Sequence, residues 1–346
     1  MTTETTTNDV PLKALLVLPR LRIQNANAIS SPLTWGFPAI TAFTGLMTAL
    51  ERRLGPQAGI TFYGVGVICH GFEPQVTRGG YTRSFHLTRN PVLQDGGTAG
   101  IVEEGRVHLD ITLVFDVELA LSRSGEAERA ALAADIGELV SSMRVAGGSV
   151  IPALPGAFRR PPRPSLEQLP DNSDPEAGRK KFHRLSRRWL PGFALVSRDD
   201  LLQTRLLEMQ ATHPDATVLD AWLDLSRLNH RATKTQVQDK TTGDMQEAIE
   251  WNIDSRPGWT VPMPVGFAPL TALHPPGAVV GARDPSVPFQ FVESVYSIGQ
   301  WISPHRLGNV DQVIWRPTHD PATGLYRCIN AFSPDSFPAS VSSSVD

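Results

Sequence analysis

Uncharged hydrogen-bonding side chains are concentrated in one short stretch near the start of the chain. Between Arg20 and Pro38 the sequence places Gln24, Asn25, Asn27, Ser30, Ser31 and Thr34. Their amide and hydroxyl groups donate and accept hydrogen bonds without charge, which suits them to read base edges and sugar hydroxyls, or to cap the backbone of a loop. Self-capping is the expected role of any one of these residues alone. For the whole run we favour recognition.

A second set of candidate residues is cationic. The segment Arg179-Lys-Lys-Phe-His-Arg-Leu-Ser-Arg-Arg-Trp189 carries six Lys or Arg residues and no acid. At helical spacing Phe182, Leu185 and Trp189 form an apolar seam, which leaves the cations on the remaining surface. A solvated helix face is the usual outcome of such a run. Six uncompensated cations in a chain of net charge −3 favour a phosphate track instead, with Arg187 and Arg188 holding phosphates.

An insertion at residues 73–106 is rich in Gly, Arg and Thr. Arg89 and Asn90 lie in it, and its arginines could clamp phosphates or stack on unpaired bases. The alternative is a flexible, soluble hairpin. We favour a packed element, because Phe85 and Leu87 indicate that its tip packs on something.

Two further positions complete the candidate set for RNA contact. Arg144 precedes Gly147, Gly148 and Ser149, where exposed backbone amides at a helix-to-strand junction can meet phosphate or ribose oxygens. Glycine pairs also end many helices, so the motif alone is a weak signal. Arg306 is a further candidate phosphate ligand.

Nine histidines raise the question of catalysis. His305 with Arg306, or His86 with Arg89, could supply the base and the cation that a metal-independent endoribonuclease needs. The sequence offers no nucleophile with a base and an orienting partner, no metal-ligand spacing and no phosphate-binding loop of the Gly-rich Lys-Ser/Thr type. We therefore predict no catalytic residue, no metal and no cofactor.

Bulk properties limit the class of protein. The 346 residues suffice for one or two domains, and no segment reaches the roughly 18 consecutive apolar residues that span a bilayer. The first residues lack a signal-peptide pattern, so we expect a cytoplasmic protein without membrane contact. The 32 Lys and Arg residues against 35 Asp and Glu count against a free-standing nucleic-acid binder, unless the cations are clustered and the acidic faces are solvated or meet other subunits.

Apolar periodicity predicts the elements that position these residues. The predicted order is a strand at 14–18, a helix at 40–54, strands at 60–69 and 107–119, a helix at 125–145 and a strand from 149. This β-α-β-β-α-β order is typical of the ferredoxin-like, RNA-recognition-type fold, in an α+β protein. The aromatic signature of RNA-recognition domains is missing, so RNA would be held by loops.

Two local features of this pattern carry structural expectations. The polar stretch becomes a strand-to-helix connection of about 15 residues, far longer than the usual 2 to 6, which favours a functional loop. Gly64 and Gly66 inside the second strand indicate a bulge or the close approach of another backbone.

The domain organisation follows from the same pattern. We predict a disordered tail at 1–10, the ferredoxin-like domain at 11–154 with an inserted thumb at about 73–106, and a Pro-rich linker at 155–178. A mixed α/β half begins with the basic helix at 179 and runs to 332, before a second disordered tail at 333–346. The pattern at 259–332 does not resolve into a fold.

The polar stretch, from Arg20-Leu to Trp35-Gly-Phe-Pro38, closely resembles the opening of the second Csy protein family, the Cas-five-type subunit of the type I-F CRISPR surveillance complex. Further blocks fit that family in order: Leu87-Thr-Arg-Asn-Pro91, Ile101-Val-Glu-Glu-Gly-Arg106, Met143-Arg-Val-Ala-Gly-Gly-Ser149, Leu190-Pro-Gly-Phe-Ala-Leu-Val-Ser-Arg198, Trp301-Ile-Ser-Pro-His-Arg306 and Gly324-Leu-Tyr-Arg327. The resemblance is close to full length.

The resemblance implies a non-catalytic subunit that caps the 5′ handle of the CRISPR guide RNA. It implies pairing with the large subunit that surveys target DNA and contact with the first backbone subunit, and it leaves open a contact with target DNA near the protospacer-adjacent motif. It also implies RNA contacts from a glycine-rich loop after the second helix and from a thumb, places that Gly147-Gly148 and residues 76–105 occupy. The alternatives are a guide-processing endoribonuclease, although in type I-F systems a separate subunit makes that cut, and a protein adaptor without RNA contact.

Overall fold

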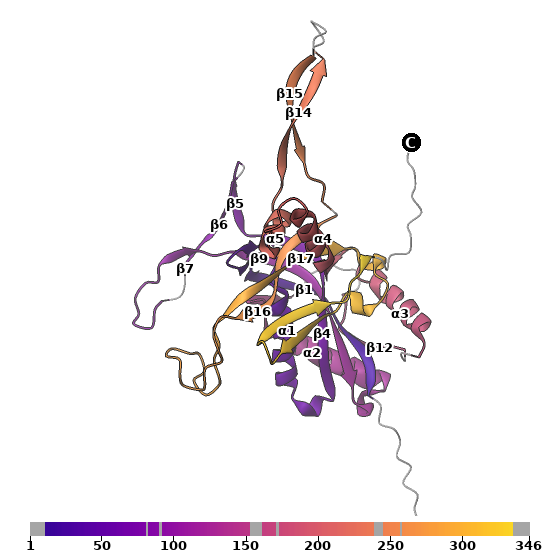
Figure 1. Cartoon of the computed structure of the whole chain (residues 1–346). Coiled ribbons are helices and arrows are strands. Elements are labelled where there is room, and N and C mark those ends of the chain that lie inside the picture. Colours follow the sequence, from indigo (N-terminus) through magenta and orange to yellow (C-terminus); the bar gives the residue numbers. More distant parts are fainter. Residues whose placement is uncertain are drawn as a thin grey trace, which may run out of the picture.

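The computed structural model describes residues 11–80, 82–89, 92–152, 161–170, 173–238, 245–256 and 258–334. The predicted tail at 1–10 and nearly all of the predicted tail at 333–346 lie outside these residues. The fold is α+β, with a large antiparallel sheet between helices (Figure 1). No helix in the described ranges is long and apolar enough to cross a membrane.

In its described residues, the first half of the chain contributes six strands of the main sheet. Its elements are β1 (Leu12–Asn27), β2 (Ile29–Ser31), β3 (Thr34–Trp35), α1 (Ile40–Leu54), β4 (Ile60–Pro74), β5 (Val76–Gly79), β6 (Thr82–Phe85), β7 (Leu87–Arg89), β8 (Ile101–Glu103), β9 (Arg106–Leu119), α2 (Glu126–Ser141), β10 (Arg144–Val145), β11 (Gly148–Ile151) and β12 (Ser165–Gln168). Short 3-10 turns lie at Pro56–Ala58 and Leu121–Arg123.

The second half adds further strands and three helices within the described residues. These are α3 (Pro175–Arg187), β13 (Phe193–Ser197), α4 (Asp199–Gln210), α5 (Val218–Ser226), β14 (His230–Gln238), β15 (Met245–Ile253), β16 (Thr260–Pro269), β17 (Val292–Ile302), β18 (Trp315–Asp320) and β19 (Leu325–Asn330). Short 3-10 turns lie at Pro304–Arg306 and Val310–Gln312.

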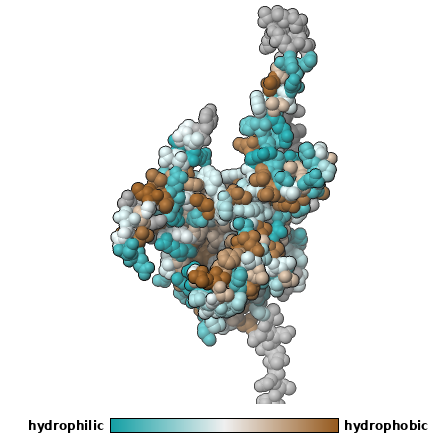
Figure 2. Space-filling model, turned by 60° about the vertical axis from the view of Figure 1, so that its left-hand side comes forward, coloured by the Kyte–Doolittle hydropathy of each residue, from teal (hydrophilic) through white to brown (hydrophobic). Residues whose placement is uncertain are grey.

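The main sheet has the strand order β10-β11-β1-β9-β4-β13-β17-β16-β19-β18, with β12 paired to β1. The segment predicted as a linker at 155–178 thus contains an edge strand, β12, and the start of α3. Strands β5 to β8, in the predicted thumb, form two small hairpins outside the main sheet, and β14 and β15 pair only with each other. These two arms, the thumb formed by β5 to β8 and the β14–β15 hairpin, stand apart from the body (Figures 1 and 2).

Strand β1 divides two hydrophobic cores because successive side chains point to opposite faces of the sheet. Ala14, Leu16 and Leu18 pack in the core that contains α1 and α2. Leu15 and Val17 pack on the other face, in the core that contains the apolar seam of α3. That seam is confirmed: Phe182, Leu185 and Trp189 are buried. Both faces of the sheet are therefore covered.

The strand predicted at 107–119 is confirmed as β9, whose alternate apolar residues from Val107 to Leu119 are all buried. The strand predicted at 14–18 is too short, because β1 continues to Asn27. Register shifts at Leu18/Leu21 and Ile23/Ala26 let the strand continue through polar residues. The long loop predicted from 20 to 38 is therefore wrong: it is mostly strand, followed by the β2–β3 hairpin.

The helix predicted at 125–145 ends earlier, at Ser141. Gly147 is therefore not a helix cap but part of the two-residue turn that joins β10 to β11. Ala146 has φ +48° and Gly147 has φ +80°. Two successive positive φ angles are the conformation of the hairpin turn that matches the twist of its strands, and they explain the glycine.

The prediction for Gly64 and Gly66 is confirmed. The β4–β9 register shifts between Phe62 and Gly64, and residues 313–315 pass directly over both glycines. A Cβ atom on Gly64 would lie 2.7 Å from the Trp315 carbonyl oxygen. This approach lets β18 pair with β4 through buried Trp315, so β4, β13, β17, β16, β19 and β18 close into a ring.

Replacing Gly64 with alanine should open this ring. We expect Gly64→Ala to lower the free energy of unfolding by about 1–3 kcal/mol, because the added methyl group has no room. The matched control is Gly178→Ala in α3, where a Cβ meets nothing within 4 Å; it should be neutral or raise stability by up to about 1 kcal/mol. Urea denaturation measures both, and equal stabilities of the two variants would contradict the close approach.

Candidate nucleic-acid interface

The end of β1 and the β10–β11 hairpin bring two predicted groups of residues together. Gln24 pairs with Ser149, and the backbone N–H of Asn27 donates to the carbonyl oxygen of Ala146 at 2.9 Å. Gly148 is buried against β1, and a Cβ there would lie 2.8 Å from the Gln24 carbonyl oxygen. Only a glycine permits this approach. Arg144 also pairs with Ser149, so it belongs to the same cluster.

Several polar side chains of the run cap their own backbone. The Asn27 side chain accepts from Ile29 N–H at 3.0 Å and donates to the Ile29 carbonyl oxygen at 2.8 Å. The buried Ser31 hydroxyl accepts from Thr34 N–H at 3.1 Å, and the Ser30 hydroxyl bonds to the Thr34 hydroxyl at 2.7 Å. Self-capping, the role expected of single residues in this run, is therefore the observed role of Asn27, Ser30 and Ser31.

Gln24 and Asn25 differ from these capping residues. Both are exposed, and within the described part of the chain neither side chain has a hydrogen-bond partner. Asn25 sits at the second register shift with φ +58°, and its backbone N–H donates to His108 Nδ1 at 3.1 Å. The bulge fixes the backbone and leaves the amide side chain available to a ligand.

A groove of about 540 Å³ joins this cluster to helix α1. It is lined by Asn27, Ser30, Arg144, Ala146 and Gly147, by Pro38, Ala39, Thr41, Ala42, Gly45, Leu46 and Ala49, and by Phe267. The Arg144 guanidinium donates to the Gly147 carbonyl oxygen at 3.1 Å, which holds it at the turn while other N–H groups stay available for a phosphate. The α1 residues and Phe267 were not predicted, because small residues on a helix and an isolated Phe carry no signal in the sequence.

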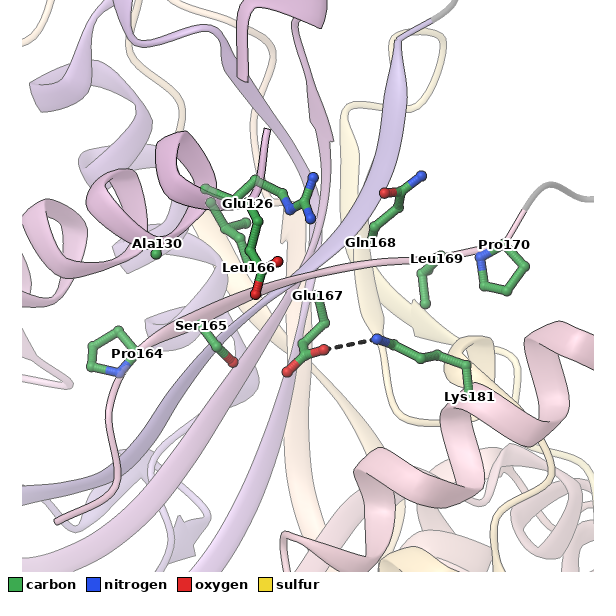
Figure 3. Close-up of a pocket in the computed structure, with 11 residues that line it drawn as sticks. Glu126, Ala130, Pro164, Ser165, Leu166, Glu167, Gln168, Leu169, Pro170 and Lys181 are labelled. Atoms are coloured by element: carbon green, nitrogen blue, oxygen red, sulfur yellow. Dashed lines mark hydrogen bonds and ion pairs between the residues drawn. The ribbon is translucent and has the colours of Figure 1, made fainter. Parts of the chain in front are cut away.

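The cations of α3 are partly neutralised, contrary to the prediction that none is compensated. Lys181 Nζ lies 2.8 Å from Glu167 Oε2 (Figure 3), and Arg188 lies 2.8 Å from Glu167 Oε1. Burial raises the pKa of Glu167, but hydrogen bonds from Lys181 and Arg188 outweigh it and hold the pKa below its ordinary value. Lys180 pairs with Glu176 at 2.7 Å.

Three cations of this helix remain for a ligand. Within the described ranges, Arg179, Arg184 and Arg187 take part in no ion pair, and all three are exposed. The 3-10 turn that contains Arg306 packs against α3. The predicted phosphate ligands Arg187, Arg188 and Arg306 therefore lie apart from the groove, since α3 and α1 cover opposite faces of the sheet, and Arg188 is already paired with Glu167.

The predicted thumb contacts the end of the polar stretch. The ring of Phe85 lies edge-on to Trp35, with centroids 5.6 Å apart, so its predicted packing is confirmed. Leu87 is 68% exposed and does not share this contact. The backbone of Arg89 lies on β7 opposite Ile101, and Asn90 falls outside the described residues.

A half-buried histidine on β4 links the segment between α3 and β13 to the sheet. His70 Nδ1 lies 2.6 Å from the Pro191 carbonyl oxygen and Nε2 lies 2.8 Å from the Thr112 hydroxyl. The carbonyl can only accept, so Nδ1 carries the proton and Nε2 accepts from Thr112. Burial is the main cause that lowers the pKa of His70 below its ordinary value of 6.5, and Arg20 adds to it.

The described residues contain no group of three or more His, Cys, Asp or Glu that could hold a metal ion.

A family model described as CRISPR-associated protein (Cas_Csy2) matches residues 16–328, which include every predicted RNA-contact residue from Gln24 to Arg306. The chain is also 46% identical over 317 residues to a protein named CRISPR-associated protein Csy2 from Pseudomonas aeruginosa, and the match covers 91% of this chain and 94% of that protein.

The histidine network predicts a pH dependence of stability. Because the folded pKa of His70 lies below its unfolded value, the unfolded state binds the proton more readily, and the stability contributed by His70 is present above about pH 6.5 and lost as the pH falls. We expect the difference in free energy of unfolding between about pH 7.5 and pH 5 to be smaller in His70→Gln than in the wild type. Urea titrations at each pH measure it, with exposed His319 changed to Gln as the control. An unchanged pH dependence in His70→Gln would show that His70 titrates as a solvated side chain.

Proposed function

Because the chain belongs to the Csy2 family of CRISPR-associated proteins, we propose that it is the non-catalytic RNA-binding subunit that caps the 5′ handle of the guide RNA in a type I-F surveillance complex. In this proposal it is the Cas-five-type subunit, and it acts in the cytoplasm in defence against foreign DNA. Its protein partners are the large subunit and the first backbone subunit, and target DNA near the protospacer-adjacent motif is a further candidate contact.

One observation carries the proposal: the pairing of the polar end of β1 with the β10–β11 hairpin, whose turn also lines the groove on α1. Gln24, Asn25 and Ser149 supply exposed uncharged polar groups at this end of the sheet, and Arg144 supplies the adjacent cation. Unpaired nucleotides present both base edges and a phosphate to such a surface. The combination therefore suits a short single-stranded segment better than a protein surface.

The strand order supports a ferredoxin-like domain at 11–154 with the thumb at 73–106. In this interpretation β11-β1-β9-β4 is the four-stranded unit, and α1 and α2 cover one of its faces. Helix α3 packs on the opposite face, which RNA-recognition domains use for base stacking. RNA would consequently be held by the turn, the bulge and the thumb at the edges of the sheet.

The second cationic group suits the backbone of the same RNA. Arg179, Arg184 and Arg187 are exposed on one helix, beside the turn of Arg306. We assign Arg179, Arg184 and Arg187 to phosphates, because exposed cations without acidic partners release counterions when they bind a polyanion. This clustering reconciles an overall net charge of −3 with RNA binding.

The alternative of a metal-independent endoribonuclease receives less support. His305 Nδ1 bonds to the Ser303 hydroxyl at 2.9 Å, which gives the imidazole a structural partner rather than the carboxylate that would orient a general base. We therefore assign Arg306 to phosphate binding and propose no catalytic residue.

Removing the exposed side-chain amides of Gln24 and Asn25 should reduce the preference of the protein for an intact 5′ handle. In Gln24→Ala/Asn25→Gly, the glycine preserves the positive φ at 25 and the Asn27 cap is untouched. Two lost hydrogen bonds should reduce preference for an intact over a scrambled handle by roughly 5- to 150-fold. The measurement is copurification with the large subunit and both guide RNAs.

The control for that experiment is Gln168→Ala, which removes an exposed amide from β12 and should retain the preference. The proposal is contradicted if handle identity makes no difference to the wild-type protein. Cleavage of repeat RNA by the purified chain would instead support the endoribonuclease.

Replacing the exposed arginines of α3 should change RNA affinity without changing the preference for an intact handle. Arg179→Ala/Arg184→Ala/Arg187→Ala should weaken binding to intact and scrambled handles alike. It should lower the slope of log affinity against log salt by about 2, since each phosphate contact on a single strand contributes roughly 0.7. Titrations over a salt series measure the slope. An unaltered slope would mean that these arginines stay solvated and do not contact RNA phosphates.

A further inference from the structure

Six aromatic residues from distant parts of the chain surround a small cavity beside the groove. Trp35, Phe37, Phe72, Phe193, Trp259 and Trp301 line it, in a volume of about 230 Å³. Buried Leu195 and Met263 also contribute to its wall. This volume is below the roughly 300–1,000 Å³ of sites for drug-sized ligands, so it suits one planar ring system.

The rings leave each other's faces partly uncovered. Phe37 meets Trp301 edge-on, with centroids 4.9 Å apart, and Phe193 meets Trp259 edge-on at 5.7 Å. Trp35 is 49% exposed and Trp259 is 61% exposed, although both belong to this cluster. Exposed aromatic faces around a buried apolar wall form a stacking platform for a flat ligand.

The indole N–H groups distinguish these tryptophans from those of the core. Trp222 and Trp315, both buried, donate to the carbonyl oxygens of Ser297 at 3.0 Å and Leu195 at 2.8 Å. Trp35, Trp259 and Trp301 donate to nothing among the described residues. The cavity thus combines aromatic walls with three tryptophans whose indole N–H groups have no acceptor among the described residues.

We propose that this cavity receives one unpaired nucleobase of the bound guide RNA; the inference rests on the proposed function. A base stacks on aromatic rings and carries carbonyl and ring-nitrogen acceptors for the indole donors. An apolar side chain from a protein partner could not accept a hydrogen bond from those N–H groups. Pro38 lines both this cavity and the groove on α1, so a strand lying in the groove can place a neighbouring base in the cavity.

The test is a double-mutant cycle between the protein and the RNA. The assembled complex, with full-length wild-type chain or Trp259→Ala, is offered a limiting equimolar mixture of an intact guide RNA and one lacking a single base of its 5′ handle. The ratio of the two RNAs retained is measured for each handle position. In the wild type one position should show a loss of roughly 5- to 150-fold, and in Trp259→Ala that loss should disappear.

Two further variants keep the result interpretable. Trp259→Phe keeps a ring and should retain the preference at that position. Trp251→Ala, which removes a 67% exposed tryptophan from the β14–β15 arm, should behave as the wild type. Comparable thermal unfolding of the variants shows that each is folded.

The outcomes separate this inference from the function on which it rests. If handle RNA is retained but Trp259→Ala and base removal act independently at every position, the cavity holds no base and only this inference is overturned. The same holds if Trp259→Ala instead weakens binding of a protein subunit. If the wild-type complex retains no handle RNA selectively, the proposed function fails as well.

Discussion

Backbone pairing between β1 and β11 is the interaction on which the candidate RNA interface depends. It requires Gly148, because any side chain there would collide with the backbone of β1. It also requires β1 to remain a strand through its polar end, which the bulge at Asn25 permits. Without this pairing, Arg144 and the Ala146–Gly147 turn would not lie beside Asn27, and the groove on α1 would have no second wall.

The sheet separates the two kinds of contact that we propose. On one face, α1 and α2 cover the core, and the groove opens beside α1 with a lining of mostly small or apolar residues and one cation, Arg144. On the other face, α3 buries its apolar seam and exposes arginines. Glu167 on β12 anchors α3 through two ion pairs, so part of the charge of this helix fixes its position and part is left for a ligand.

Local patterns in the sequence were sufficient for elements whose burial is regular. Strand β9 alternates without interruption, and the seam of α3 repeats at helical spacing, so both were predicted correctly. Gly64 and Gly66 signalled a close approach, although not that residues 313–315 make it. The end of β1 was misjudged because bulges break the alternation that identifies a strand.

Features that combine distant segments could not be predicted from the sequence. Glu167 neutralises cations 14 and 21 residues away only because β12 pairs with β1 beneath α3. The groove joins residues 27–49 to 144–147 and Phe267, and the aromatic cavity draws on β4, β13, β16 and β17. None of these contacts has a sequence signal, since each depends on the order of strands in the sheet.

Photocrosslinking within the assembled complex tests the central claim most directly. Guide RNAs carrying 4-thiouridine at successive positions of the 5′ handle would be irradiated in the complex, and crosslinked peptides identified by mass spectrometry. The account predicts crosslinks from handle positions to the polar end of β1 through the β2–β3 hairpin, residues 20–38, and to β10–β11, residues 144–151. Handle crosslinks confined to α3 and the Pro304–Arg306 turn, or to other subunits, would contradict it.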